Sequence, residues 1–360
     1  MRNILFFAAL LWAFAAQSAG LNQIGSSQPP AWSFYWNFIN SQAAAPPGWT
    51  VTRAACAGSV SSCVTNAQYN DAAGASYITY SANNPIFSPR GIGSFENRTN
   101  YLFPSENPTT TTTGTIPTGY YVLICNGSGS ILSAAVTGTG SGLGTLNCSS
   151  TYQTFQVTVA GTFIFTVTGT VNWADVQGPC LYANSACGPT PHIITTSGTS
   201  TRPADAIKFG VVEVSTIQAG NSSVVLEYYS TSSGATNQIS LLGSPINGLQ
   251  ISPIDAGNAN KCTSTIANVA NLATSGSNQS LFTTNRVAAT NLKKGYNLSC
   301  NGGASTASSS TSATSFGVSL QLGNGNALYY CNCWISQIKI WPIVLPNPLL
   351  QLYSTAGVRF

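Results

Sequence analysis

The sequence predicts an all-β protein that contains two antiparallel β-sandwich (jelly-roll) units in tandem. Apolar residues alternate with hydroxyl and amide residues along most of the chain, which is the period of a half-buried strand. Clusters of Gly, Asn, Ser and Pro interrupt these segments at short intervals, as in sandwiches and jelly rolls. The chain has 360 residues, enough for two or three domains.

The clearest alternation is "TFQVTVAGTFIFTVTGTV" at 154–171, which predicts a β-hairpin that turns at Ala160-Gly161. Strands are also expected at "GYYVLICN", "VVEVS", "VVLEYY", "VSLQLG" and "WISQIKIW". A short helix is expected only at "VLPNPLLQLYS", where Pro346 and Pro348 restrict its start.

Turn-rich segments at 104–119 and 187–203 predict joints between units, because Pro and Gly resist the continuation of strands. We therefore expect a signal peptide at 1–19, a β-rich N-terminal segment at 20–104 and a small β-sandwich at 105–186. A linker at 187–203, a concanavalin-A-like jelly roll at 204–345 and a C-terminal tail at 346–360 complete the predicted organisation.

The first residues, "MRNILFFAALLWAFAAQSAG", combine Arg2, an apolar run and small residues, and so predict a cleaved secretory signal. No later apolar run is long enough to span a bilayer, so no membrane span is expected once the signal is removed. The net charge is only +4 and no basic stripe is present, which argues against nucleic acid as a partner.

Ten cysteines follow the predicted signal, and an even number in an exported chain favours disulfide bonds. Their spacing suggests three local pairs, Cys56–Cys63, Cys125–Cys148 and Cys180–Cys187. The last four, Cys262, Cys300, Cys331 and Cys333, are expected to pair among themselves. A zinc site is disfavoured because His192 is the only histidine and no C-x-x-C pair occurs.

Three motifs in a fixed order resemble bacteriophage tail- and head-fibre-associated structural proteins. They are "WTVTRAACAGSV…DAAGASYITYSANNPIF", "PRGIGSFENRTNYLFP" and "SGTSTRPADAIKF", and they include Arg53, Arg90, Glu96, Arg98 and Asp205. The chain departs from that family at Pro203, where Ala is usual. It departs also in its predicted signal and disulfides, which virion proteins assembled in a cytoplasm do not need.

The C-terminal part resembles a concanavalin-A-like (laminin-G-like) lectin domain, through "NRVAATNLKKGYNLSCNGG" and "WISQIKIWPIVLPNPLLQLYS". Such domains often hold calcium, and the resemblance makes Asp255, Asn258 and Asn260 weak candidates for ligands. One acidic residue is few for calcium, so a polar turn is the better interpretation and no cofactor is expected. The cations Lys293 and Lys294 are predicted to lie at a solvated turn between two strands.

Sugar binding needs aromatic faces surrounded by amide and hydroxyl groups, and we take Tyr229, Tyr330 and Trp334 as the candidate contacts. The alternative for each is core packing, since half of the aromatic residues in sandwich strands point inward. An enzymatic alternative, a polysaccharide hydrolase or lyase, would use Glu213 and Glu227 as acid and base if both lie on one sheet face.

These observations favour a secreted, non-enzymatic structural or adhesive protein, phage-fibre-like and with carbohydrate binding. Its partners would be cell-surface glycans or other surface and fibre proteins, and its location extracellular, cell-surface or periplasmic. The glycan-degrading enzyme remains the alternative function.

Overall fold

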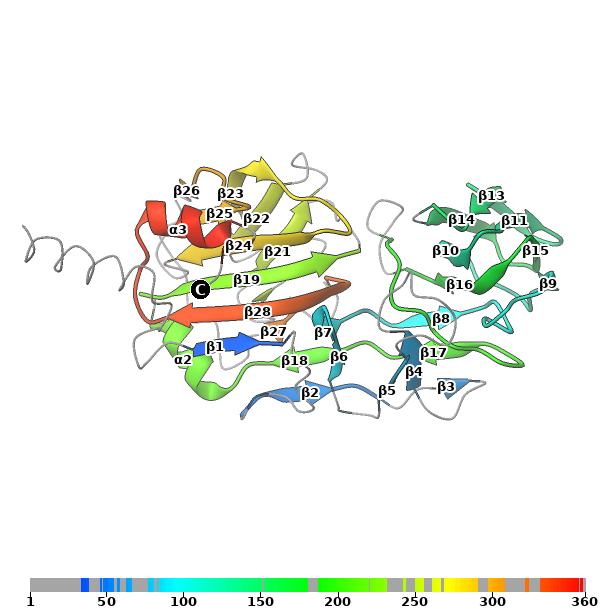
Figure 1. Cartoon of the computed structure of the whole chain (residues 1–360), viewed down its shortest axis with the longest axis horizontal. Coiled ribbons are helices and arrows are strands. Elements are labelled where there is room, and N and C mark those ends of the chain that lie inside the picture. Colours follow the sequence, from blue (N-terminus) through cyan, green and yellow to red (C-terminus); the bar gives the residue numbers. More distant parts are fainter. Residues whose placement is uncertain are drawn as a thin grey trace, which may run out of the picture.

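The strands of the protein form two β-sandwiches, one large and one small (Figure 1). The computed structural model describes residues 34–38, 46, 48–54, 57–58, 63–66, 77–80, 83, 85–150, 152–180, 187–219, 221–231, 242–243, 250–255, 261–266, 269–290, 297–307, 321–323, 331–355 and 357–358. The predicted signal, Cys56 of the predicted Cys56–Cys63 pair and the predicted turn at Lys293 and Lys294 lie outside the described residues.

The large sandwich packs an eight-stranded sheet against a seven-stranded sheet. The order of the first is β26-β25-β24-β19-β28-β7-β6, and β1 also pairs with β28. Its strands are β1 (Phe34–Asn37), β6 (Ile86–Ser88), β7 (Gly91–Ser94), β19 (Ser223–Ser230), β24 (Thr284–Thr290), β25 (Asn297–Cys300), β26 (Thr306–Ala307) and β28 (Cys333–Trp341).

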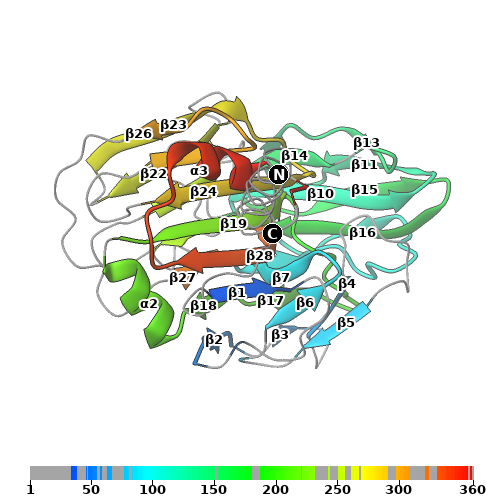
Figure 2. The same cartoon turned by 60° about the vertical axis from the view of Figure 1, so that its left-hand side comes forward.

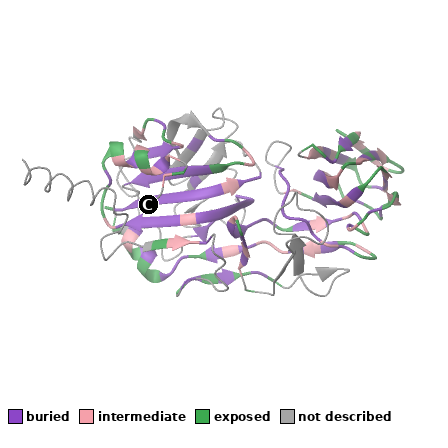
Figure 3. Ribbon diagram, viewed as in Figure 1, coloured by how far each residue is buried: buried purple, intermediate pink, exposed green. Residues whose placement is uncertain are grey.

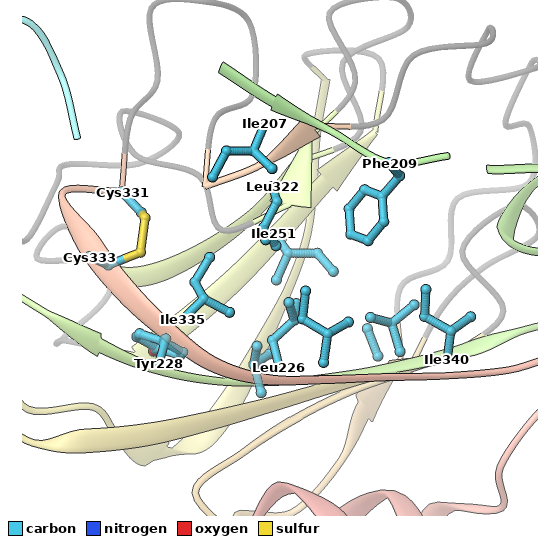
Figure 4. Close-up of a cluster of buried hydrophobic side chains, with 14 of the residues drawn as sticks. Ile207, Phe209, Leu226, Tyr228, Ile251, Leu322, Cys331, Cys333, Ile335 and Ile340 are labelled. Atoms are coloured by element: carbon cyan, nitrogen blue, oxygen red, sulfur yellow. A yellow bond between two sulfur atoms is a disulfide. The ribbon is translucent and has the colours of Figure 1, made fainter. Parts of the chain in front are cut away.

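The facing sheet of the large sandwich has the order β2-β18-β27-β20-β21-β22-β23. Its strands are β2 (Thr50–Thr52), β18 (Ala206–Lys208), β20 (Leu242–Gly243), β21 (Gln250–Asp255), β22 (Lys261–Ile266), β23 (Val269–Asn278) and β27 (Gln321–Leu322). Between the two sheets lies an apolar core in which Leu226, Tyr228 and Ile335 meet Ile207, Ile251 and Leu322 (Figure 4). Buried residues run along the central strands β19, β24 and β28 (Figure 3).

The small sandwich packs another seven-stranded sheet against a four-stranded sheet. The former contains β3 (Ala57–Gly58), β8 (Arg98–Asn100), β10 (Gly119–Gly127), β12 (Thr139–Ser141), β14 (Gln153–Val159), β16 (Val171–Gly178) and β17 (Ser200–Arg202). The latter contains β9 (Thr111–Thr112), β11 (Ser130–Ala135), β13 (Thr145–Asn147) and β15 (Phe163–Thr168). Strands β4 (Cys63–Asn66) and β5 (Tyr77–Tyr80) form a separate pair.

The small sandwich is inserted into the large one. Strands β1, β2, β6 and β7, which precede it in the chain, complete the sheets formed by the C-terminal half. After an earlier contribution from β3, which pairs with β17, the chain passes from β7 into the small sandwich at β8 and returns through β17. Strands β8 and β17 pair with each other. The all-β, sandwich prediction is therefore confirmed. Apart from the separate β4–β5 pair, the described strands of the predicted N-terminal segment are divided between the two sandwiches.

The predicted hairpin at 154–171 is wrong in its pairing. Strand β14 pairs with β10 and β12, whereas β15 pairs with β11 and β9, so the two strands lie in opposite sheets. Phe155 and Phe163 instead face each other across the core, with ring centroids 6.4 Å apart. Two consecutive strands in opposite sheets form an arch. A hairpin and an arch bury the same alternating residues, which is why alternation alone did not distinguish them.

Two helices are described, and the sequence predicted one of them. Helix α3 (Asn347–Ser354) begins after Pro346, as expected, and covers part of the outer face of β24 (Figures 1 and 2). Helix α2 (Val211–Gln218) replaces the strand predicted at "VVEVS". Val214 and Ile217 enter the core at helical spacing, while Val211 and Val212 are exposed, so tertiary packing overrides the β propensity of valine. No helix in the described part of the chain is long and apolar enough to cross a membrane.

Four of the predicted disulfide linkages fall within the described residues. Cys125 is bonded to Cys148 and Cys180 to Cys187, as the spacing predicted. The last four cysteines pair among themselves as Cys262–Cys300 and Cys331–Cys333. Cys262–Cys300 joins the two sheets of the large sandwich.

The three sequence motifs that carry the predicted resemblance meet where the chain crosses between the sandwiches. Five of their residues form what we call the junction cluster: Arg53, Glu96, Arg98, Arg202 and Asp205. Each is at most 2% exposed. The charged groups are linked to one another and to the backbone, so these motif residues have an architectural role.

Within the junction cluster, Arg53 donates from Nη1 to Oδ1 of Asp205 at 2.6 Å, and Asp205 also accepts from the backbone N–H of Phe95. Arg98 forms an ion pair with Glu96 and donates to the sulfur of Cys180. Arg202 donates to the carbonyl of Glu96 at 3.0 Å. The cluster therefore connects strands of both sandwiches through buried charge-assisted hydrogen bonds.

Candidate functional site

Polar side chains lie on the outer face of the eight-stranded sheet, where they alternate along each strand with residues that face the core. Leu226 and Tyr228 of β19 point into the core, so Glu227 and Tyr229 point outward. On β24, Val287 lies in the core and Arg286 on the outer face. Helix α3 covers one end of this face, and the other end points toward the small sandwich (Figure 1).

A β-bulge shapes the uncovered end of the face. The register between β19 and β28 shifts between Glu227 and Tyr228, which leaves Ser336 as the extra residue of β28. Its hydroxyl donates to Oε1 of Glu227 at 2.7 Å. Bulges commonly redirect side chains beside binding sites, and here the bulge fixes the orientation of a carboxylate.

A pocket of about 350 Å³ opens beside this bulge. Its lining includes Arg90, Glu227, Tyr229, Phe282, Thr283 and Ser336. The volume lies in the lower part of the range for small-molecule sites. The pocket therefore combines the aromatic residues Tyr228, Tyr229 and Phe282 with charged groups and hydroxyls.

Arg90 is positioned by a tight turn and an aromatic ring. It lies between β6 and β7, and its backbone N–H donates to the hydroxyl of Ser88 at 3.0 Å. Gly91 follows at φ +119°, where a Cβ would overlap the carbonyl oxygen of Ile335, so only glycine allows the turn to approach β28. The Arg90 guanidinium carbon lies 3.8 Å from the centroid of the Tyr229 ring. This stacking presents a preoriented fork of N–H donors to the pocket.

Glu227 is the corresponding acceptor. Its Oε2 accepts from Nε of Arg286 at 2.9 Å and from Nη2 at 2.5 Å, while Oε1 accepts from Ser336. Arg286 in turn donates to the carbonyls of Thr355 and Val358. These contacts use about three of the roughly four acceptor positions of a carboxylate. One acceptor position of a rigidly held carboxylate is then available at the pocket wall.

Vicinal hydroxyl groups match this arrangement. A sugar hydroxyl can accept from the guanidinium of Arg90 and donate to a carboxylate such as Glu227, while the C–H face of the ring packs against an aromatic side chain. The donors and acceptors are held before any ligand arrives, which limits the entropy lost on binding. The arrangement can therefore recognise a polyhydroxylated ring without a chemical step.

Of the three predicted sugar contacts, the structure places Tyr229 in the pocket. One of its ring faces is covered by Arg90, so Tyr229 positions the guanidinium and is not an open stacking platform. Trp334 is only 2% exposed and packs against Phe95 at 4.9 Å between ring centroids, so it belongs to the core. Tyr330 lies outside the described residues.

The structure does not bring together the two carboxylates proposed as acid and base. Glu213 lies in α2, not on a strand, and accepts from the indole N–H of Trp49 at 3.1 Å in the apolar core. Glu227 lies on the outer face of the sheet. The expectation of two strand carboxylates on one face is therefore wrong. Among the calcium candidates, the backbone of Asp255 ends β21, and Asn258 and Asn260 lie outside the description.

His192 lies buried in the small sandwich, although its segment was predicted to be a linker. It stacks on Trp173, and its ring nitrogens contact Asp175 at 2.7 Å and Glu106 at 2.5 Å. Burial alone would lower the pKa of His192, but the charges of Asp175 and Glu106 and their hydrogen bonds raise its pKa to about 9. Glu106, His192 and Asp175, here called the histidine clamp, thus hold an imidazolium at neutral pH.

No family model matches the chain, and no curated protein matches it in sequence. Several solved structures are similar in part. The CBM40 of the Ruminococcus gnavus IT-sialidase covers 39% of this chain and 86% of its own, at 15% identity and a TM-score of 0.24. Leech intramolecular trans-sialidase covers 39% of this chain and 24% of its own, at 16% identity and a TM-score of 0.23. NanB sialidase of Streptococcus pneumoniae covers 39% and 25%, at 12% identity and a TM-score of 0.24. Such TM-scores are too low to transfer a ligand or an activity.

Sequence reasoning missed two pocket residues, Arg90 and Phe282. Arg90 was matched only as part of a family motif, and its neighbour on the ring, Tyr229, lies far away in the sequence. Phe282 stands in "SLFTTN", which shows no alternation or charge pattern. The proximity of these residues depends on the register of β28 against both β7 and β19.

Proposed function

We propose that this protein is a secreted, non-enzymatic surface or fibre-type structural protein that binds carbohydrate in the Arg90 pocket. One observation carries the binding proposal. A guanidinium stacked on Tyr229 and a carboxylate fixed by Arg286 and Ser336 line one small pocket, with Phe282 as an apolar wall. Fixed donors, fixed acceptors and an aromatic side chain are the groups that a sugar ring needs.

The structural part of the proposal is supported by the junction cluster. Motif residues resembling those of phage structural proteins form buried ion pairs where the chain passes between the sandwiches, and the disulfide bonds are compatible with an exported protein. Such a joint would fix the pocket on a rigid support.

A glycan array screened with the full chain tests the binding proposal, followed by calorimetric titration of the best glycan. Arg90→Met should weaken binding at least tenfold, because the pocket loses its fixed donors. Lys208→Met is the matched control, since it removes the same charge from an exposed position on β18 and should leave affinity unchanged.

A blank array, or equal affinity of wild type and Arg90→Met, would overturn the proposal. Release of reducing sugar from a polysaccharide panel, abolished in Glu227→Gln, would instead establish the enzymatic alternative.

A further inference from the structure

Phe282 adopts a backbone conformation that aromatic residues rarely adopt. Its φ is +58°, in the left-handed region. The other described non-glycine residues with positive φ are all asparagine: Asn83, Asn107, Asn301 and Asn332. Asparagine tolerates this region because its short side chain bonds locally, whereas a bulky side chain there is strained. The surrounding structure must therefore impose the conformation of Phe282.

Hydrogen bonds to the end of β19 and from a buried asparagine impose the backbone conformation of Phe282. The backbone N–H of Phe282 donates to the carbonyl of Ser230 at 3.0 Å, at the end of β19. Asn285, which is fully buried, donates to the carbonyls of Ser280 and Thr283 at 2.7 and 3.1 Å. The loop at 280–283 is thus closed on both sides of Phe282, which is one of the residues that line the pocket.

The small sandwich holds the ring from the other side. The rings of Tyr152 and Phe282 meet edge to face, with centroids 5.7 Å apart and an interplanar angle of 63°. Tyr152 directly precedes β14 and packs with Val122, Ile124 and Trp173 of the small sandwich. Phe282 therefore lies between the pocket of one sandwich and a tyrosine of the other.

We propose that Phe282 is a ligand-contacting residue of the pocket and that Tyr152 is its positioning residue. The ligand would be a pyranose whose C–H face packs on Phe282 while neighbouring hydroxyls reach Arg90 and Glu227. Backbone strain of this kind is concentrated at ligand-binding sites, and glycine or asparagine would build the same turn without it. The site is complete only when both sandwiches are present. This inference rests on the carbohydrate-binding function proposed above.

The test compares Phe282→Gly with a matched control, Asn107→Gly. Both substitutions place glycine at a residue of positive φ, but Asn107 is exposed and belongs to the small sandwich near β16. Phe282→Gly should lower affinity for the array-selected glycan at least tenfold while its thermal midpoint stays equal to wild type or rises. Asn107→Gly should leave affinity unchanged.

Tyr152→Leu tests whether Tyr152 positions Phe282, because it keeps apolar packing but removes the edge-to-face ring contact. It should weaken binding about threefold to tenfold, with no change in the thermal midpoint beyond that of a surface substitution. Phe282→Tyr, which retains the ring, should bind within twofold of wild type.

Wild-type affinity in Phe282→Gly, together with lost binding in Arg90→Met, would overturn the role of Phe282 and leave the proposed function intact. Wild-type affinity in Tyr152→Leu would overturn the positioning role. Wild-type affinity in all three variants would contradict the pocket itself.

Discussion

The junction cluster and the Arg90 pocket contain the same types of charged side chain in different roles. Both contain arginine and glutamate, yet Arg53 and Arg98 are enclosed, whereas Arg90 lies half-buried at a pocket. In the junction, charged groups bind one another in buried ion pairs where the chain passes from one sandwich to the other. In the pocket, the Arg90 guanidinium stacks on the Tyr229 ring and lines the pocket wall. Both regions contain an ion pair and a stacked arginine, since Arg286 pairs with Glu227 at the pocket and Arg202 lies over the Phe95 ring in the junction. In a chain with 6% charged residues, what distinguishes Arg90 is its partial exposure at a pocket.

Arg53→Met should break the junction with the largest effect on stability. It leaves the carboxylate of Asp205 buried without its partner at 2.6 Å. Removing one member of a buried pair costs about 3–5 kcal/mol, so the free energy of unfolding in urea should fall by that amount. Lys208→Met, on an exposed side chain, should change it by less than about 0.5 kcal/mol. Equal unfolding curves for both variants would contradict an architectural junction.

The histidine clamp should make the stability of the small sandwich depend on pH. The folded-state pKa of His192 is raised to about 9 from its ordinary 6.5, so the stabilisation is complete below pH 6.5 and is lost as pH rises through 9. The shift corresponds to a loss on the order of 3 kcal/mol. Urea midpoints between pH 6 and pH 10 measure it. His192→Asn should flatten this dependence, and an unchanged slope would refute the assigned clamp.

Arg286→Met should lower both stability and glycan affinity, because Arg286 holds Glu227 of the pocket and also binds the C-terminal segment. Losing hydrogen bonds to a charged group costs about 1.5–3 kcal/mol, a smaller effect than at the junction. Glycan affinity should fall as Glu227 loses its orientation. Calorimetric titration of the folded variant measures this fall, and full affinity would show that the orientation of Glu227 does not matter for binding.

Tyr229→Leu should have the smallest effect and should act on binding alone. It removes the ring that holds the Arg90 guanidinium, a cation–π contact worth about 0.5–1 kcal/mol at exposed sites, or roughly twofold to fivefold in affinity. Thermal unfolding should match wild type. A large loss of stability without a loss of affinity would place Tyr229 with the core residues instead.

The sequence contained enough information for the strands and for most of their faces. Alternation located β10, β19 and β28, and cysteine spacing predicted the Cys125–Cys148 and Cys180–Cys187 bonds, while the pairing of the last four cysteines was left open. It did not separate an arch from a hairpin at Ala160-Gly161, because both bury Phe155 and Phe163. It also read "VVEVS" as a strand, although Val214 and Ile217 have helical spacing.

The site was less accessible to sequence reasoning. Tyr229 was chosen as an aromatic residue of a strand, and the same argument chose Trp334, which is buried. The two residues are register partners across β19 and β28, so only their neighbours distinguish them. Arg90 covers Tyr229, while Phe95 and Ile86 enclose Trp334. These neighbours come from strands distant in sequence, and no local pattern specifies them.

A crystal structure of the protein with its array-selected glycan tests the central claim most directly. We expect a sugar ring between Phe282 and Arg90, with a hydroxyl within hydrogen-bond distance of Glu227 and with the junction cluster unchanged. A sugar bound elsewhere, with the Arg90 pocket occupied only by solvent, would contradict it.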